Sequence, residues 1–391
     1  MSYRLIYICI GFASFLTVVF HMFNQQPQFV KILTGGLQFL SVIFLSFNLH
    51  KLHNKTLRVF LRLILLYVLI QITRCLLFPT EIAFTTFIFS PYNVFWCSLP
   101  LFILLTNDNS FIRKYLKLSI VCCLLSIFVL RAIGLGVFIL CVFSPYFKKR
   151  KASLLITTIA IGVDVAYGLG VLGIESARTY LLEIVVMLWA GFAIWILQSK
   201  KLAKWSAIFL LAFPIILVLS IFTFEDSILK MVNEYGGANN EVIGSDTRTF
   251  LYVEIIQNMN SLSDWLFGLG YNARYFSDFF LNSTSENADF YMRTNVEVGF
   301  LQLLLKGGII LVFMHYYLLI RAVYTGIKNS SNLLCNGCAL FIAGYILLSF
   351  IVDYPSRNPI VQILPWICAG ICFSKNMLSK SDKEINALIK S

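Results

Sequence analysis

Arginine is the main basic residue in one set of connecting segments of this 391-residue chain. The segments that connect the apolar runs fall into two sets, and the basic residues of one set are mostly lysines. In the other set they are six arginines and one lysine: Arg131, Arg178, Lys230, Arg248, Arg274, Arg293 and Arg357. A guanidinium group binds two phosphate oxygens at once and never loses its proton, whereas an ammonium group acts as a point charge. This choice of residue type predicts a phosphate-binding site built from individual arginines.

Arg178 and Arg248 are the leading candidates for that site. Arg178 lies at the start of a predicted membrane helix, three residues after Glu175. Arg248 lies in the first turn of another predicted helix, where its charge opposes the helix dipole. Arginine beside a helix N-terminus makes a natural anion site, which favours a functional role for Arg248. Arg178 could instead anchor its helix at the membrane interface.

Arg293 and Arg274 are the second pair of phosphate-binding candidates. Arg293 lies four residues after Asp289 and four before Glu297, so helical salt bridges would explain it equally well. Arg274 and Arg357 fit a structural role slightly better than a functional one. The long segment that holds Arg248, Arg274 and Arg293 also carries ten acidic residues, which excludes a general basic patch.

Histidine and cysteine give little support for a metal site. The four histidines, His21, His50, His53 and His315, lie in apolar segments, at a helix end or in a lysine-rich connection. Cys335 and Cys338 form a lone CxxC motif without a second ligand pair, so we interpret them as small packing residues. We therefore predict neither a metal nor another cofactor.

The composition indicates the class of protein that carries these residues. Apolar residues make up 59% of the chain and charged residues 13%, against about 45–50% and about 25% in soluble domains. This argues against a water-soluble enzyme and predicts an all-α polytopic membrane protein. Apolar runs predict twelve membrane helices, at 5–23, 29–48, 59–78, 82–105, 116–131, 132–147, 152–173, 180–197, 205–222, 296–320, 334–352 and 359–374.

The charges predict the orientation of these helices. With Arg4, the connections at 49–58, 107–117, 148–151, 199–204 and 321–333 and the tail from 375 hold 20 of the 31 basic residues and three of the 19 acidic ones. Their net charge is therefore +17, and that of the remainder is −5. The positive-inside rule then places both termini in the cytoplasm. The total of +12 indicates topology and not a nucleic-acid partner.

One connection, at 223–295, is far longer than the others, and it lies on the external side. Ser245 or Asp246 would cap a helix whose apolar residues 250–256 recur at helical period, which predicts a short amphipathic helix against the membrane face. Residues 265–272 follow as an apolar turn whose glycines allow a close backbone approach.

Ionisable residues inside the apolar helices are costly and are functional candidates by default. They include Arg62 and Arg74, which lie near helix ends and are expected to extend toward the interface. Lys306 lies deeper, and we expect it to pair with Asp164 or Glu183.

An ordered series of motifs in the second half of the chain resembles the O-antigen polymerase (Wzy) family, which is related to the O-antigen ligases. The motifs are Glu175-Ser176-Ala177-Arg178, then Arg248, then Trp265-Leu266-Phe267-Gly268-Leu269-Gly270, then residues 297–308 from Glu297 to Gly308. The apolar runs and charges divide the chain into nine helices at 1–222, a large external loop at 223–295, helices ten to twelve at 296–374 and a cytoplasmic tail at 375–391, and the resemblance implies that the loop is periplasmic.

This resemblance implies a GT-C-like fold and an inverting, metal-independent glycosyl transfer at the periplasmic face of the bacterial inner membrane. The donor would be a growing polysaccharide on undecaprenyl pyrophosphate, and the acceptor a single lipid-linked repeat unit. A separate protein would regulate chain length. In the ligases a histidine stands where this chain has Glu297, which favours the polymerase.

The candidate residues suit that chemistry. Arg178 and Arg248, with Arg293 and Arg274 behind them, would hold the pyrophosphate as its negative charge develops. Glu297, at the mouth of a membrane helix, would accept the proton of the attacking sugar hydroxyl, and partial burial would strengthen it as a base. A salt bridge to Arg293 is the plainer explanation of Glu297. An O-antigen ligase and a lipid-linked oligosaccharide flippase are the alternative functions.

Overall fold

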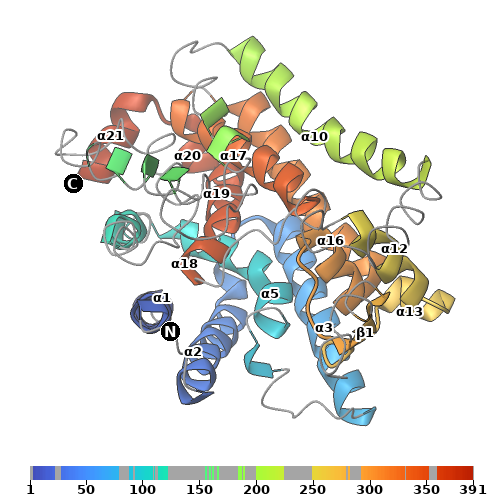
Figure 1. Ribbon diagram of the computed structural model, residues 1–391. Coiled ribbons are helices and arrows are strands. Elements are labelled where there is room, and N and C mark those ends of the chain that lie inside the picture. The colour runs from blue at the N-terminus through green and yellow to red at the C-terminus, as the bar shows by residue number, and fades with distance from the viewer. Residues whose placement is uncertain are drawn as a thin grey trace.

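Helices make up most of the part of the chain that the structure describes (Figure 1). The computed structural model describes residues 3–22, 28–78, 88–90, 93–108, 110, 113–121, scattered residues from 155 to 189, 200–223, 249–278, 281, 292–330, 332–351 and 359–390. Within these ranges four helices are long and apolar enough to cross a membrane, and shorter apolar helices accompany them. The chain is therefore consistent with an all-α membrane protein.

The first three predicted helices coincide with helices of the structure. Helix α1 (Tyr3–Met22) packs against α2 (Gln28–Phe47), and the 3-10 turn η1 (Leu49–Lys51) leads to α3 (Lys55–Leu77). Asn54 caps α3, because its side chain accepts a hydrogen bond of 3.2 Å from the amide of Leu57. Many large apolar side chains on the outer face of α3 are exposed, as expected for a surface that meets lipid.

Two predicted helices are interrupted in the structure. Within the predicted helix at 82–105, the described residues form α5 (Val94–Ser98) and the 3-10 helix η2 (Leu99–Asn107). Residues 94–106 of these two elements are all buried. The prediction at 359–374 is divided into α18 (Pro359–Gln362) and α19 (Leu364–Phe373). Pro365 lies in the first turn of α19, where the missing amide hydrogen costs no helical bond.

Helix α10 (Lys200–Thr223) contains the prediction at 205–222 and packs on α17 (Leu333–Ser349), which matches the prediction at 334–352. The predicted helices at 116–131, 132–147, 152–173 and 180–197 lie wholly or largely outside the described residues.

Helix α16 (Gly299–Asn329) extends well beyond its predicted end and is kinked at Gly308, where φ is 64°. Helix α17 follows it, and then the tail folds as α20 (Lys375–Ser379) and α21 (Asp382–Lys390). The side-chain amide of Asn332 donates to the carbonyl oxygens of Met377 (2.8 Å) and Lys380 (2.9 Å). The connection before α17 and the tail, both predicted to be cytoplasmic, therefore lie together.

The described part of the long external segment folds onto the first half of α16. It contains α12 (Thr249–Asn258), α13 (Leu262–Phe267) and a ladder of β1 (Tyr275–Phe276) with β2 (Met292–Arg293). Figure 1 shows these elements beside α16 and one end of α3, away from α20 and α21.

This segment differs from the sequence prediction in two ways. Residues 250–255 of α12 are each at most 6% exposed, so the helix is part of the core and does not lie amphipathically on a surface. Phe250, Leu251, Tyr252 and Ile255 belong to one buried cluster with Val298, Leu301 and Leu305 of the α16 start. The apolar residues 265–267 end a helix that Ser261 and Asp264 start with a capping box, and the turn begins only at Gly268.

Candidate functional site

Arg293 and Glu297 form an ion pair at the mouth of α16. The Nη2 atom of Arg293 lies 3.0 Å from Oε1 of Glu297, and the two side chains are 22% and 51% exposed. The salt bridge considered from the sequence is therefore present. The sequence predicted that the Glu297 carboxylate is partly buried, and the structure shows that it is more exposed than that.

A buried amide fixes the backbone next to this pair. Gln302 lies one turn into α16, and its Oε1 accepts a hydrogen bond of 2.8 Å from the amide of Val296. Its Nε2 donates to Oδ1 of Asn295 at 3.4 Å. Because the Gln302 side chain is fully buried, it holds residues 295 and 296 in one position and so fixes the start of the Glu297 side chain.

The β1–β2 ladder positions Arg293. Tyr275 pairs with Arg293 across the two strands, which places their side chains on one face. Asn258 at the end of α12 holds β1 with two bonds of 3.0 Å, one from the Phe276 amide to its Oδ1 and one from its Nδ2 to the Phe276 carbonyl oxygen. Arg293 therefore stands on a strand that is fixed to a buried helix.

Tyr275 is a neutral hydroxyl beside these charges. Burial raises its pKa to about 12; Arg293 opposes this rise, while Glu254 and Glu297 add to it. Glu254, buried on α12, accepts a hydrogen bond of 2.9 Å from the Ser277 hydroxyl. The site thus combines a guanidinium, two carboxylates and a protonated phenol. These groups can hydrogen-bond the hydroxyls of a sugar, and the guanidinium is the one among them that can contact a phosphate.

Lys306 connects the interior of α16 to the strand that carries Tyr275. Its ammonium group is buried and donates to the carbonyl oxygens of Tyr271 (3.3 Å) and Ala273 (3.0 Å). Among the described residues its hydrogen bonds go to backbone and not to a carboxylate; the expected partners Asp164 and Glu183 lie outside the described residues. Lys306 therefore positions the chain that leads into β1.

The kink in α16 provides a contact for the glycine turn after α13. At Gly308 the helical bonding is broken, so carbonyl oxygens of the preceding turn need other donors. The Leu305 carbonyl oxygen accepts from the amide of Leu269 (2.7 Å), and that of Gly307 accepts from the Tyr67 hydroxyl (2.5 Å). The turn and helix α3 thus satisfy backbone groups that the kink exposes.

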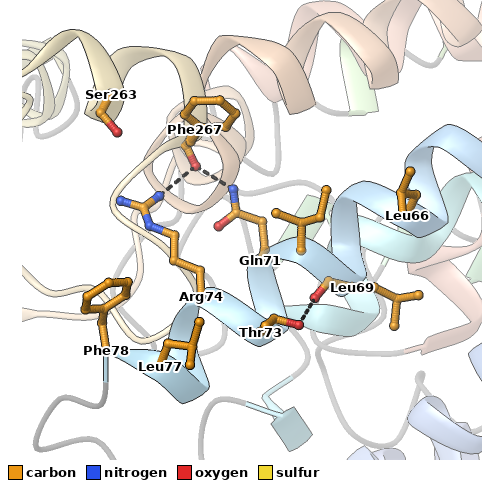
Figure 2. A pocket seen from close by; sticks show the side chains of 10 residues that line it. Leu66, Leu69, Gln71, Thr73, Arg74, Leu77, Phe78, Ser263 and Phe267 are labelled. Carbon is orange, nitrogen blue, oxygen red and sulfur yellow. Dashed lines mark hydrogen bonds between the residues drawn. The ribbon is translucent and has the colours of Figure 1, made fainter.

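Helix α3 holds the same turn from its other side (Figure 2). Nη1 of Arg74 donates to the Gly268 carbonyl oxygen at 2.7 Å, and Nε2 of Gln71 donates to that of Phe267 at 2.7 Å. Arg74 does not simply extend toward the interface, as expected from the sequence; it binds the C-terminal carbonyls of α13. Arg74 also lines an open groove of about 540 Å³ whose wall is the apolar face of α3, with Ser263 and Phe267 opposite.

The structure describes three of the five site residues predicted from the sequence. Glu297 and Arg293 are brought together, and Arg274, half-buried, directly precedes β1. Arg178 and Arg248, the two leading phosphate candidates, lie outside the described residues, as do Arg131, Lys230 and Arg357. Among described residues, no group of three or more His, Cys, Asp or Glu side chains could hold a metal ion.

Sequence reasoning missed the residues that position the site. Gln71 and Gln302 are the main examples, and their signal was available: an amide inside an apolar helix must find hydrogen-bond partners. Asn258 and Tyr275 gave no such signal, because only the folding of the loop on itself gives them Phe276 and Arg293 as neighbours. Comparison of the chain with protein-family models, with curated proteins and with solved structures finds no match.

Proposed function

We propose that this chain is an O-antigen polymerase with twelve membrane helices and a GT-C-like fold. It joins oligosaccharide repeat units carried on undecaprenyl pyrophosphate at the periplasmic face of the bacterial inner membrane. The observation that carries the proposal is the Arg293–Glu297 pair, a guanidinium of the kind that can bind phosphate and a carboxylate, both held at the mouth of a helix long and apolar enough to cross a membrane. A lipid-linked substrate would present its pyrophosphate and first sugar at that depth.

The reaction assigns a role to each charged group. The acceptor hydroxyl gives its proton to Glu297 as its oxygen bonds to the anomeric carbon of the donor. The bond from that carbon to the pyrophosphate breaks on the opposite face, so the configuration inverts and the pyrophosphate leaves with the electron pair. Arg293 engages Oε1 of Glu297, which leaves Oε2 for the hydroxyl. Arg178, Arg248, Arg293 and Arg274 stabilise the leaving charge.

The rigidity of the described site supports this assignment. Asn258 fixes the strand that pairs with Arg293, Gln302 fixes the backbone between Arg293 and Glu297, and Lys306 fixes the chain leading to Tyr275. Charged groups held in place before the substrate arrives need no reorganisation during the reaction. The open groove beside Arg74 offers an apolar surface on which the isoprenoid chain of the carrier can lie.

Replacing one carboxylate tests the proposal. In a polymerase-deficient strain that expresses Glu297→Gln, we expect lipopolysaccharide with a single repeat unit and at least a roughly 100-fold loss of polymer, the usual effect of removing a general base. Asp278→Asn, an exposed carboxylate change in the same segment, is the matched control and should keep the full ladder. A full ladder with Glu297→Gln would exclude the base assignment.

Deleting the whole gene distinguishes the function classes. Loss of a polymerase leaves lipopolysaccharide capped with one repeat unit. Loss of a flippase leaves none, and loss of a ligase leaves polymer on the carrier lipid. Either of the last two results would overturn the proposal.

A further inference from the structure

A second groove lies at the end of α3 and α16 opposite the candidate site. It has a volume of about 240 Å³ and lies between the start of α3, the second half of α16 and the junction of α19 with α20. Leu57, Phe60, Tyr317, Arg321 and Lys375 are among the residues that line it. Further along α3, Tyr67 contacts the kink of α16, and Gln71 and Arg74 contact the end of α13 and the glycine turn, so the two grooves are at different ends of the same helix pair.

The groove draws its walls from three segments that the charge pattern places on the cytoplasmic side. Asn54 belongs to the connection at 49–58, Arg321 to that at 321–333, and Lys375 begins the tail. These segments are far apart in the sequence, and the structure gathers them into one surface.

The charge of this groove is positive. Arg321 and Lys375 are both exposed, and none of the described residues that line the groove is acidic. The described acids of the tail are engaged elsewhere, since Asp382 accepts from the Leu333 amide (2.8 Å) and Glu384 accepts from the Ser381 amide (2.7 Å). An anion would therefore find two cations here without a competing carboxylate from the tail.

Aromatic residues place the groove at the depth of a membrane interface. Arg321 lies over the ring of Tyr317 (5.9 Å) and donates to its hydroxyl (3.1 Å). Lys328 repeats this arrangement seven residues later, 5.0 Å from the ring of Tyr324 and 2.6 Å from its hydroxyl. Tyrosines with cations beside their hydroxyls are typical of the boundary where lipid head groups lie.

An apolar wall continues from the groove along the helices. The ring of Tyr317 packs against Phe60 at 5.1 Å and against Phe313 at 5.7 Å, and Phe313 is 61% exposed. A molecule whose phosphate lies on Arg321 and Lys375 could therefore lay a hydrocarbon chain over Phe60 and Phe313. A free phosphate would leave this wall unused.

We propose that this groove binds an anionic membrane phospholipid, with the lipid phosphate on Arg321 and Lys375 and an acyl chain on the wall of Tyr317, Phe60 and Phe313. Basic pockets between membrane helices on the cytoplasmic side are suited to such head groups. The site does not depend on the glycosyl transfer proposed above.

Lipid retention by the purified full chain tests the inference. Native mass spectrometry in detergent measures adducts with phosphatidylglycerol and with phosphatidylcholine, and we expect a clear preference for the anionic lipid. Arg321→Gln with Lys375→Gln should weaken phosphatidylglycerol binding roughly 30-fold, since each basic residue near an anionic surface contributes about 1 kcal/mol. Lys201→Gln with Lys204→Gln removes the same charge from exposed positions on α10 and should leave binding unchanged.

Two further measurements distinguish lipid binding in this groove from non-specific electrostatic attraction between the lipid and the protein. Thr325→Trp fills the groove and keeps both cations, so it should also abolish the preference. Glycerol phosphate, which lacks acyl chains, should not compete at equal concentration. Equal loss in the α10 variant, retention in the groove variants, or full competition by glycerol phosphate would each overturn the proposal.

Discussion

Gly268 and Gly308 meet with no side chain between their backbones. A methyl group on Gly268 would lie 2.6 Å from the amide nitrogen of Gly308, and one on Gly308 would lie 2.5 Å from that of Gly268. Both residues have positive φ, 70° and 64°. This contact joins the loop to the kinked helix, and the segments on either side carry the residues that hold Arg293 and Glu297 in place.

Gly268→Ala should therefore destabilise the protein strongly. Overpacking costs about 1–3 kcal/mol and a left-handed alanine adds about 1–2 kcal/mol. We expect the thermal midpoint of the detergent-purified protein to fall by at least about 5 °C. Gly36→Ala is the control, because nothing lies within 4 Å of that position. An equal midpoint for the two variants would mean that the contact does not hold the loop.

Arg74→Met should loosen the same turn from the side of α3. It removes the charged donor to the Gly268 carbonyl oxygen, a type of bond that contributes about 1.5–3 kcal/mol. Hydrogen exchange at the amides of residues 269–271 should become faster. Arg62→Met, an exposed arginine on the same helix, should leave that exchange unchanged, and matching rates in both variants would contradict the role given to Arg74.

Glu297→Gln should change activity and not stability. Exposed ion pairs contribute about 0–1 kcal/mol, and the Glu297 side chain is 51% exposed. We expect the thermal midpoint to move by less than about 2 °C while polymer formation is lost. A drop as large as that of Gly268→Ala would show that the carboxylate acts in folding, and the loss of polymer would then carry no catalytic meaning.

The two ends of the helix pair should face opposite sides of the membrane. Ser263, on α13, and Ser379, on α20, are both exposed, and the seven described native cysteines are buried. A membrane-impermeant maleimide should label Ser263→Cys on intact spheroplasts, and Ser379→Cys only after lysis. Labelling of both variants before lysis would contradict the predicted topology.

The sequence alone predicted every long membrane-spanning candidate in the described residues. Helices α2, α3, α10 and α16 each follow an apolar run, because a bilayer demands about 20 apolar residues whatever they contact. It also predicted the pairing of Arg293 with Glu297, but as a contact within a helix, whereas Arg293 lies on β2 and Glu297 precedes α16. The membrane-spanning candidates therefore follow from short stretches of chain, and the geometry of the ion pair does not.

The tertiary structure decided what holds those residues. Lys306 binds the backbone carbonyls of Tyr271 and Ala273, which the sequence did not predict, and α12 was expected on a surface and is buried. Arg74 finds its partner only because the glycine turn lies against α3 and the kink at Gly308, and Asn258 finds its partner only because the loop folds on itself. Apolar periodicity indicates which residues are buried, but it does not indicate which other segment they pack against. Hydrogen bonds between segments that are far apart in the chain form only when those segments pack together.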